Sequence, residues 1–321
     1  MAIYTKLNKS EIAQILMRFP ALPHTSFTAK GIALGTVNTY DRITYKSGAV
    51  YYLKIDEVAN ESRLANEIRI FDNLIKFQNR LTHATPAPLF SDTGLRYISF
   101  QHKFALVIPE LAGISYFKHD LTHARLERVG KAVAEWHSVP VDPKIPEHRF
   151  SLAGQKKVFQ QISSELKKRH PDLHKMIQRK LAELAKTDLP KQNSVLIHAD
   201  LFPENILWQK TKLSAILDFD AAGLGDAFFD IAVCIHALCH DGNKFSQSKI
   251  QALLRGYFGL KTLSRTQKSH LNHALELTTL RFLLTRLRDV ELSPMGRKAK
   301  PFKDYREFAR RLQHPLTKPY L

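Results

Sequence analysis

The chain has 321 residues, of which 44% are hydrophobic and 24% are charged, and it carries a formal net charge of +18 at pH 7. This composition is that of a folded globular protein and excludes a disordered chain, and the length suffices for two lobes of ordinary domain size. Only two cysteines are present, Cys234 and Cys239, which excludes a disulfide-rich scaffold.

The apolar stretches are too short for a membrane protein built of helices. The longest spans roughly residues 227–239 and is interrupted by Asp230, whereas a membrane-spanning helix needs about 20 apolar residues. Met1–Ser10 has no apolar run behind a basic start, so we see no secretory signal. We therefore expect a cytoplasmic protein with no membrane partner.

The positive charge does not by itself indicate a nucleic-acid partner. Lysines and arginines are spread along the chain, with short clusters at Lys167–Arg169, Arg297–Lys300 and Arg310–Arg311. No arginine-rich arm, zinc knuckle or RNP-like aromatic motif accompanies them. A site that attracts anionic nucleotides explains the charge as well as nucleic-acid binding does. The sequence leaves the oligomeric state open.

The first third of the chain predicts mainly strands. Thr39–Thr44 and Val50–Ile55 are rich in β-branched and aromatic residues, and Lys46-Ser47-Gly48 between them is a turn signal, which predicts a hairpin. Glu61–Phe77 has apolar residues at helical spacing and predicts a helix. Two more strands are expected at Tyr97–Ser99 and Phe104–Ile108.

From Gly113 onward the pattern becomes mainly helical. We expect strands in this part only between Val195 and Phe219, and helices at Leu121–Val139, Gly154–Lys186 with a break near Pro171, Phe228–Cys239, Ser248–Phe258 and Gln267–Asp289. The sequence thus predicts an α+β, bilobal protein. Its parts are a small β-rich N-terminal lobe (residues 1–108), a hinge (109–113) and a large, mostly helical C-terminal lobe (114–321).

The segment 198–230 carries the residues typical of phosphoryl transfer. This reaction needs a carboxylate that orients the attacking hydroxyl and accepts its proton, and oxygen ligands that hold Mg²⁺ against the phosphates. Asp200 and Asn205 lie in the pattern H-x-D-x-x-x-x-N, which begins at His198 and has the spacing of a kinase catalytic loop. We predict that Asp200 is the catalytic base and that Asn205 is a metal ligand.

A hairpin would bring Asp218 to the same site. If the turn is centred between Thr211 and Lys212, Asn205 lies directly opposite Asp218, with Cβ atoms about 5 Å apart. A slip of one residue would move Asp218 to the other face. Asp218 also ends the apolar run Ala215–Leu217, so its charge needs a partner.

Simpler interpretations remain for each of these residues. Asp200, Asp218 and Asp226 could individually be turn or helix-cap residues, although their order and spacing together favour the catalytic interpretation. A group of cysteines and histidines, Cys234 to His240, lacks the paired spacing of structural zinc sites. The sequence has no G-x-S-x-G motif and no Walker A motif.

With these motifs the chain resembles the aminoglycoside phosphotransferase/choline kinase superfamily, which shares the protein-kinase-like fold. Two blocks carry the resemblance, Ile197–Trp208 (I-H-A-D-L-F-P-E-N-I-L-W) and Ala215–Ala232 (A-I-L-D-F-D-A-A-G-L-G-D-A-F-F-D-I-A). The resemblance implies Asp200 as catalytic base, and Asn205 and Asp218 as Mg²⁺ ligands. It implies structural roles for His198, Asp226 and Asp230, and for His137 at the end of the helix expected at Leu121–Val139. It also implies ATP as the phosphate donor.

The resemblance also implies a nucleotide site in the first third of the chain. A phosphate-covering loop falls on Gly31–Asn38, with Gly35 and Thr36 nearest the nucleotide. Lys54 falls at the position of the family's phosphate-contacting lysine, with Glu67 as its partner and Glu61 as the weaker alternative. The hinge would meet the adenine edge through the Pro109 carbonyl and the Leu111 amide, and the missing N–H of proline is no obstacle to that.

Within the superfamily the chain is most similar to the bacterial homoserine kinase branch. The stretches His198–Asn205, Phe219–Asp230 and Leu280–Asp289 carry this resemblance, although Asp220 stands where that branch is expected to have an aromatic residue. Homoserine is accordingly the favoured acceptor. The alternatives are an antibiotic (aminoglycoside-type) or choline-type phosphotransferase and, from another class, a non-catalytic kinase-like protein that binds nucleotide or nucleic acid.

The late helix adds an argument on the substrate. Arg281 and Arg288 are seven residues apart and share a helical face, with Arg286 offset, and arginines suit a substrate carboxylate. A solvated arginine face that pairs with Asp289 or Glu291 is the alternative. Asp220 could balance a substrate ammonium, because strand alternation would place it on the same side as Asp218.

Overall fold

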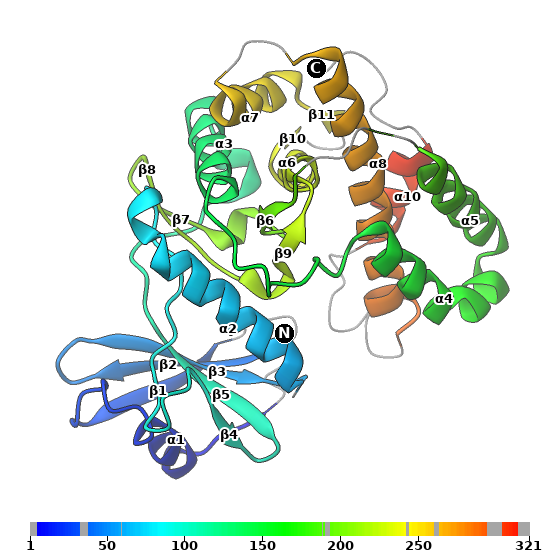
Figure 1. Cartoon of the computed structure of the whole chain (residues 1–321). Coiled ribbons are helices and arrows are strands. Elements are labelled where there is room, and N and C mark those ends of the chain that lie inside the picture. The colour runs from blue at the N-terminus through cyan, green and yellow to red at the C-terminus, as the bar shows by residue number, and fades with distance from the viewer. Residues whose placement is uncertain are drawn as a thin grey trace. The chain divides into compact units, whose positions relative to one another are not determined.

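The protein falls into two compact units, shown in Figure 1. This computed structural model describes residues 5–32, 38–58, 60–187, 189, 193–241, 244–259, 263–293 and 304–313. The smaller unit comprises residues 1–76 and 84–112, and the larger unit comprises residues 77–83 and 113–321. The first is built on an antiparallel sheet and the second mainly on helices, so the α+β class expected from the sequence is confirmed.

Five strands of the smaller unit, counted over its described residues, form one antiparallel sheet in the order β1-β2-β3-β5-β4. Their bounds are β1 Phe27–Ile32, β2 Thr39–Tyr45, β3 Val50–Asp56, β4 Ile98–Phe100 and β5 Lys103–Pro109. The predicted hairpin is β2–β3. Its turn contains Gly48 at φ +87°, a left-handed conformation that glycine adopts without a Cβ clash.

Helices α1 (Lys9–Leu16) and α2 (Glu61–Lys76) cover opposite faces of this sheet (Figure 1). Successive residues of a strand point to opposite faces. In β3, Leu53 and Ile55 pack in one apolar cluster with residues of α1, whereas Lys54 reaches Glu67 of α2. Helix α1 was not predicted from the sequence. It begins with a capping box formed by Asn8 and Glu11.

The helices of the larger unit follow the predicted ranges closely. They are α3 His123–His137, α4 Leu152–Arg169, α5 Pro171–Lys186, α6 Ala227–Leu238, α7 Gln247–Phe258, α8 Arg265–Arg286 and, unpredicted, α10 Arg306–Gln313. Proline at the first position of α5 explains the predicted break. Short 3-10 turns lie at η1 Gln78–Arg80, η2 Lys118–Asp120, η3 Pro203–Asn205 and η4 Phe219–Ala221, and a π-helical turn, η5 Leu287–Glu291, ends α8.

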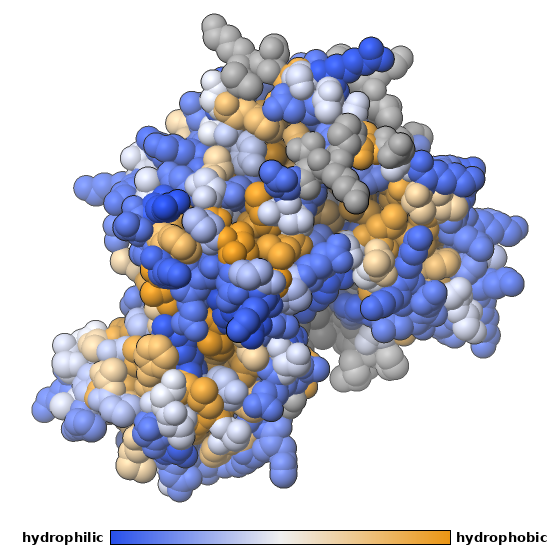
Figure 2. All heavy atoms as spheres, in the orientation of Figure 1, coloured by the Kyte–Doolittle hydropathy of each residue, from blue (hydrophilic) through white to orange (hydrophobic). Residues whose placement is uncertain are grey.

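Helix α6 lies in the core of the larger unit, with 11 of its 12 residues buried. It packs against α8, and α3 packs against α7. The α3–α7 contact depends on glycine, because a Cβ on Gly130 would lie 2.1 Å from the Leu253 carbonyl oxygen. The outward surfaces of α4 and α5 are mostly hydrophilic (Figure 2).

The strands of the larger unit are short and pair two by two. Strand β6 (Val195–Ile197) pairs with β9 (Gly223–Gly225), β7 (Ile206–Gln209) with β8 (Lys212–Ile216), and β10 (His240–Asp241) with β11 (Lys244–Phe245). The expectation that strands lie only between Val195 and Phe219 is wrong for β9, β10 and β11. These have two or three residues each, too few to show a periodic pattern.

In the part of the chain that the structure describes, we find no helix with the length and apolarity that a membrane crossing requires.

Candidate functional site

The loop that carries Asp200 connects β6 to β7 and is held from below by Asp230 of α6. The Asp230 carboxylate is fully buried and accepts hydrogen bonds from the backbone N–H of His198 (2.7 Å) and of Ala199 (2.6 Å). Trp136 Nε1 (3.2 Å) and His137 Nε2 (3.1 Å) also donate to it. Two helices and the loop therefore share one anionic anchor.

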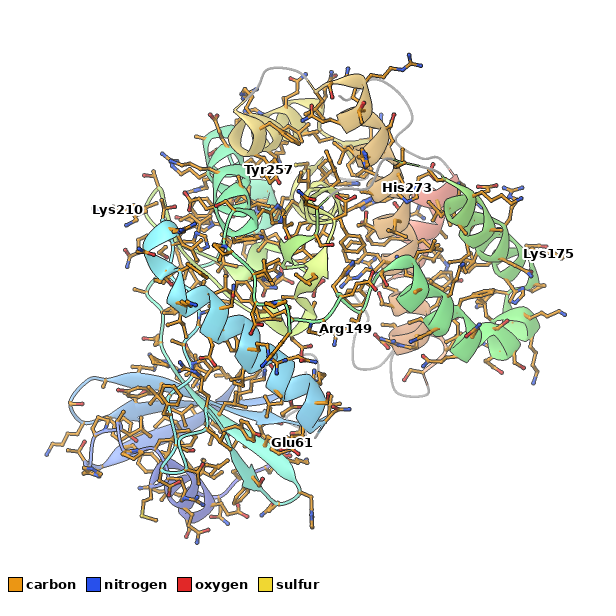
Figure 3. The ribbon with its side chains drawn as sticks, viewed as in Figure 1. Glu61, Arg149, Lys175, Lys210, Tyr257 and His273 are labelled. Atoms are coloured by element: carbon orange, nitrogen blue, oxygen red, sulfur yellow. The ribbon has the colours of Figure 1, made fainter. Side chains whose placement is uncertain are left out.

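The ionised state of Asp230 follows from these donors. Burial by itself raises the pKa of a carboxyl, but the hydrogen bond and charge of His137, with the hydrogen bond from the backbone N–H of His198, outweigh it and leave the pKa of Asp230 below its ordinary value. Tyr257 of α7, labelled in Figure 3, supports the arrangement, because its hydroxyl lies 2.8 Å from Nδ1 of His137. His137 and His198 are therefore both linked by hydrogen bonds to Asp230.

His198 links the loop to the strand that precedes Asp218. Its Nε2 donates to the Leu217 carbonyl oxygen (2.9 Å), and its Nδ1 accepts from the backbone N–H of Asp200 (3.3 Å). This pattern requires the ring proton on Nε2 and the lone pair on Nδ1. One imidazole therefore fixes the backbone at Asp200 relative to the backbone at Leu217.

Two residues with strained backbone lie on either side of this imidazole. Ala199 has φ +62° and Asp218 has φ +64°, a left-handed conformation that costs a residue with a Cβ about 1–2 kcal/mol. The two strong donors to Asp230 hold Ala199 in place. Strained residues of this kind cluster at functional sites, and here they flank the candidate catalytic and metal-binding residues.

The predicted register of the β7–β8 hairpin is wrong. Gln209 pairs with Lys212 across a turn that lies one residue earlier than expected, and Ser214 is an extra residue in a bulge opposite Leu207 and Trp208. Asn205 therefore lies opposite Leu217, whose N–H donates to the Asn205 carbonyl oxygen (2.9 Å), and not opposite Asp218. Asp218 follows the strand, where its left-handed backbone turns the chain into η4.

Asn205 and Asp218 nevertheless have side chains suited to a hard cation. The Asn205 amide nitrogen donates to the Asp200 carbonyl oxygen (3.0 Å), which leaves the amide oxygen as the ligand atom. An amide oxygen and a carboxylate are ligands that Mg²⁺ accepts, together with water and phosphate oxygens. The residues present thus fit the expected magnesium ion.

The expectation that Asp220 lies on the same side as Asp218 is also wrong. It assumed that the strand continues, but residues 219–221 form the 3-10 turn η4. Asp220 instead forms an ion pair with Arg149 (3.0 Å), which precedes α4 and is labelled in Figure 3. The sequence offered no signal for Arg149, because 71 residues separate the partners.

Arg281 lies at the candidate catalytic residue. Its Nη2 donates to Oδ1 of Asp200 (2.8 Å), and its guanidinium stacks between Phe150 (4.0 Å) and Phe282 (4.1 Å). Only 5% of Arg281 is exposed, and burial lowers its pKa, partly offset by the charge of Asp200. Its Nε–H is buried and has no hydrogen-bond partner within the described ranges.

Arg286 and Arg288 have other partners. Arg286 pairs with Glu307 of α10 (2.6 Å), and Arg288 pairs with its neighbour Asp289 (2.6 Å). Arg288 therefore pairs with Asp289, which is what the alternative interpretation of the late helix predicted. Within the described residues, Arg281 is the one of these three arginines that contacts Asp200.

In the smaller unit, Lys54 of β3 and Glu67 of α2 form a buried ion pair with an Nζ–Oε1 distance of 2.6 Å. Glu61, the alternative partner, instead accepts a hydrogen bond from the Tyr97 hydroxyl (3.3 Å). Pro109 ends β5 opposite Tyr51, and Leu111 follows at the end of this unit. Gly35 and Thr36 lie outside the described residues.

The cysteine and histidine residues of α6 have separate environments. Cys234 in α6 and Cys239 directly after it are buried, and His236 is enclosed by Leu275, Thr279 and Arg311. A search of the described residues finds no group of three or more histidine, cysteine, aspartate or glutamate side chains that could hold a metal. Asp226 caps α6 by accepting from the Phe228 N–H (2.9 Å).

Sequence comparison gives the chain's relatives. The sequence profile of the phosphotransferase enzyme family matches residues 28–264. The chain is 30% identical to the homoserine kinase of Methylobacterium radiotolerans over 318 residues, covering 97% of this chain and 95% of that protein. It is 28% identical to the homoserine kinase of Phenylobacterium zucineum over 323 residues, covering 100% and 97%.

Structural comparison finds the same fold in solved phosphotransferases. Spectinomycin phosphotransferase in complex with ADP and spectinomycin aligns with a TM-score of 0.67 at 14% identity, covering 98% of this chain and 96% of that chain. Amicoumacin kinase in complex with AMP-PNP, Ca²⁺ and its substrate aligns with a TM-score of 0.68 at 15% identity, with the same coverage. These likenesses establish the protein-kinase-like fold.

Proposed function

Because the chain belongs to the phosphotransferase enzyme family, we propose that it transfers the γ-phosphoryl group of ATP to the side-chain hydroxyl of homoserine. The reaction class, transfer to an alcohol, is that of the family. The acceptor is proposed from the homoserine kinases that the chain matches over nearly their whole length.

The single observation that carries the catalytic role is the environment of Asp200. Its backbone is fixed by His198 and, through Asp230, by α6, while its side chain is oriented by Arg281. A carboxylate held in this way can orient an acceptor hydroxyl and accept its proton as the bond to phosphorus forms. We assign Asp200 as the catalytic base on this ground.

Asn205 and Asp218 are proposed to hold Mg²⁺, which supplies charge neutralisation at the β- and γ-phosphates when it is bound. Lys54, positioned by Glu67, is proposed to contact the phosphates. Gly35 and Thr36 are proposed to cover them, and the Pro109 carbonyl and Leu111 amide, in the hinge 109–113, are proposed to bind the adenine edge. The nucleotide lobe is proposed to span residues 1–108 and the acceptor lobe residues 114–321.

Arg281 and Arg286 are proposed to face the acceptor. A cationic lining suits an acceptor that carries a carboxylate. The cationic lining and the net charge of +18 would both repel a polycationic aminoglycoside. A choline-type acceptor calls for an aromatic cage around its ammonium group. The non-catalytic alternative is disfavoured because Asp200, Asn205 and Asp218 are all present.

The test is an ADP-release assay with ATP and Mg²⁺ over homoserine, choline, amino sugars and aminoglycosides, with Asp200→Ala as the control for contaminating kinases. We expect homoserine to give the highest kcat/KM, and phosphorus NMR to show a phosphate ester on its side-chain oxygen. Turnover of another acceptor with homoserine at background would refute the proposed substrate. Salt-sensitive DNA binding without turnover of any alcohol would support the non-catalytic alternative.

A further inference from the structure

A cavity of about 380 Å³ opens in the larger unit beside the candidate catalytic loop. Phe202, Pro203 and Glu204, which follow Asp200 closely in the loop, form part of its wall. The rest of the wall comes from residues 115–118, from α6 and from the two C-terminal helices, where Arg286 and Glu307 contribute. The cavity is therefore bounded by catalytic-loop residues on one side and by an ion pair on another.

Arg286 is held rigidly at this wall. Its Nη1 donates both to the Asp304 carbonyl oxygen (2.6 Å) and to Oε2 of Glu307 (2.6 Å), and its guanidinium stacks on the Phe308 ring at 4.4 Å. In the described part of the chain its hydrogen bonds to protein use Nη1 alone. The Nε–H and Nη2 donors therefore remain available to a ligand.

A chain of polar contacts fixes Arg286 from the core outward. Oε1 of Glu307 accepts from Nη2 of Arg311, and Nη1 of Arg311 lies 3.0 Å from Nδ1 of His236. Burial holds the pKa of His236 far below its ordinary value, so its neutral ring accepts this proton through Nδ1. Burial raises the pKa of Glu307, but the charges of Arg311 and Arg286 outweigh it and keep the carboxylate ionised.

The charge of this group favours an anion. Two guanidiniums, Arg286 and Arg311, share the single carboxylate of Glu307, which leaves one positive charge in excess. At the cavity wall Lys118 and Glu204 carry opposite charges. The charge of Arg286 also acts on Arg281, the partner of Asp200, because it contributes, after burial and the charge of Arg149, to the lowered pKa of Arg281.

We propose that this cavity receives the carboxylate end of the acceptor, that Arg286 is the carboxylate receptor, and that Glu307 is a positioning residue that holds Arg286 in place. The identity of the acceptor rests on the proposed function. The site assigns a role to α10, because Glu307 and Phe308 both belong to it.

The test compares homoserine with 3-aminopropan-1-ol, which keeps the hydroxyl and the ammonium but lacks the carboxylate. We expect Arg286→Met to lower kcat/KM for homoserine roughly 10- to 100-fold more than kcat/KM for the amino alcohol, as expected for lost charge-assisted hydrogen bonds. Glu307→Gln removes the charge and can keep only one of the two hydrogen bonds, because its amide nitrogen cannot accept, and it should shift the ratio in the same direction by less. Arg310→Met, exposed on the same helix, is the matched control and should leave the ratio unchanged.

A second readout separates this inference from the proposed function. 2-Aminobutyrate has the carboxylate and ammonium of homoserine but no hydroxyl, so calorimetry measures its binding without turnover. Weaker binding in Arg286→Met supports the site even if homoserine is not phosphorylated by the native protein. An equal loss for both acceptors in Arg286→Met, or a ratio that shifts only in Arg281→Met, overturns the assignment.

Discussion

The catalytic loop and the acceptor cavity differ in how their residues are held. The loop is stabilised by a fully buried carboxylate, Asp230, with two backbone donors and two ring donors, and the residues concerned lie mostly within one continuous segment, 198–230. The cavity is assembled from five separated segments and from ion pairs that are partly exposed. The chemistry of the reaction is thus encoded locally and rigidly, whereas acceptor recognition depends on tertiary packing.

The largest effect should come from Asp200→Asn. Loss of the base should lower kcat roughly 10²- to 10⁴-fold in the homoserine assay, while nucleotide binding measured by calorimetry persists. Asp172→Asn, an exposed change at the start of α5, is the control and should have wild-type kinetics. Near-normal turnover in Asp200→Asn would show that the loop positions substrate without taking part in proton transfer.

The next largest effect should come from Asp230→Asn. The amide cannot accept from the backbone donors and from both rings together, so buried donors lose their partner and the charge facing His137 is removed. We expect the free energy of unfolding to fall by about 3–5 kcal/mol in urea titrations.

Asp226→Asn provides the matched control for this change at the same end of α6. Asparagine caps a helix as well as aspartate does, so its stability should match that of the native protein. Equal effects of the two substitutions would mean that Asp230 is no special anchor of the loop.

A third test uses the pH dependence of the protein's stability, which should reflect the titration of the buried residue His148. Burial lowers the pKa of His148, whose ring packs on Phe229, to about 4. The folded pKa is therefore below the unfolded one, and stability present above about pH 6.5 is lost as the pH falls through about 4. The loss should reach roughly 3 kcal/mol.

Thermal unfolding between pH 7 and 4 measures this slope in the native protein and in His148→Gln, where we expect it to be flatter. Asp230 titrates below this window, because its folded pKa is lower than the ordinary value. His24→Gln, an exposed substitution, should leave the slope unchanged. An unchanged slope in His148→Gln would place the pH-sensitive group elsewhere.

The smallest effect is expected on the exposed side. Arg149 is half exposed in its pair with Asp220, so Arg149→Met should change the free energy of unfolding by less than about 1 kcal/mol. Arg179→Met, which removes an exposed helix pair with Glu183, is the comparison. A loss of several kcal/mol in Arg149→Met alone would remove the contrast between a rigid loop and a tolerant surface.

The same contrast explains what could be predicted from sequence. The long helices and the β2–β3 hairpin follow from apolar spacing and turn residues, and the loop motif from Asp200 and Asn205 at fixed separation. The register at Asp218 could not be predicted, because the turn lies one residue earlier than assumed and a single bulge residue, Ser214, shifts the pairing only part of the way back. Bulges are local choices of packing, and alternation gives no sign of them.

The sequence indicated the partners of Lys54 and Arg288 but not those of several other charged residues. The contact of the Arg281 guanidinium with Asp200, 81 residues away in the chain, was not predicted. Helix α10 had a usable signal in Phe308 and Leu312, which are four residues apart and both buried. Its pairing with α8 through Glu307 had none, because contacts between distant helices depend on the assembled fold.

The position of α10 near the C-terminal end of the chain has a consequence for how substitutions within it act. Glu307 of α10 lines the proposed acceptor cavity, whereas Leu312 packs in the same apolar cluster as Ile197 and Ala199, next to Asp200. Substitutions at Glu307 should therefore change acceptor preference, whereas substitutions at Leu312 should destabilise the core that supports the catalytic loop.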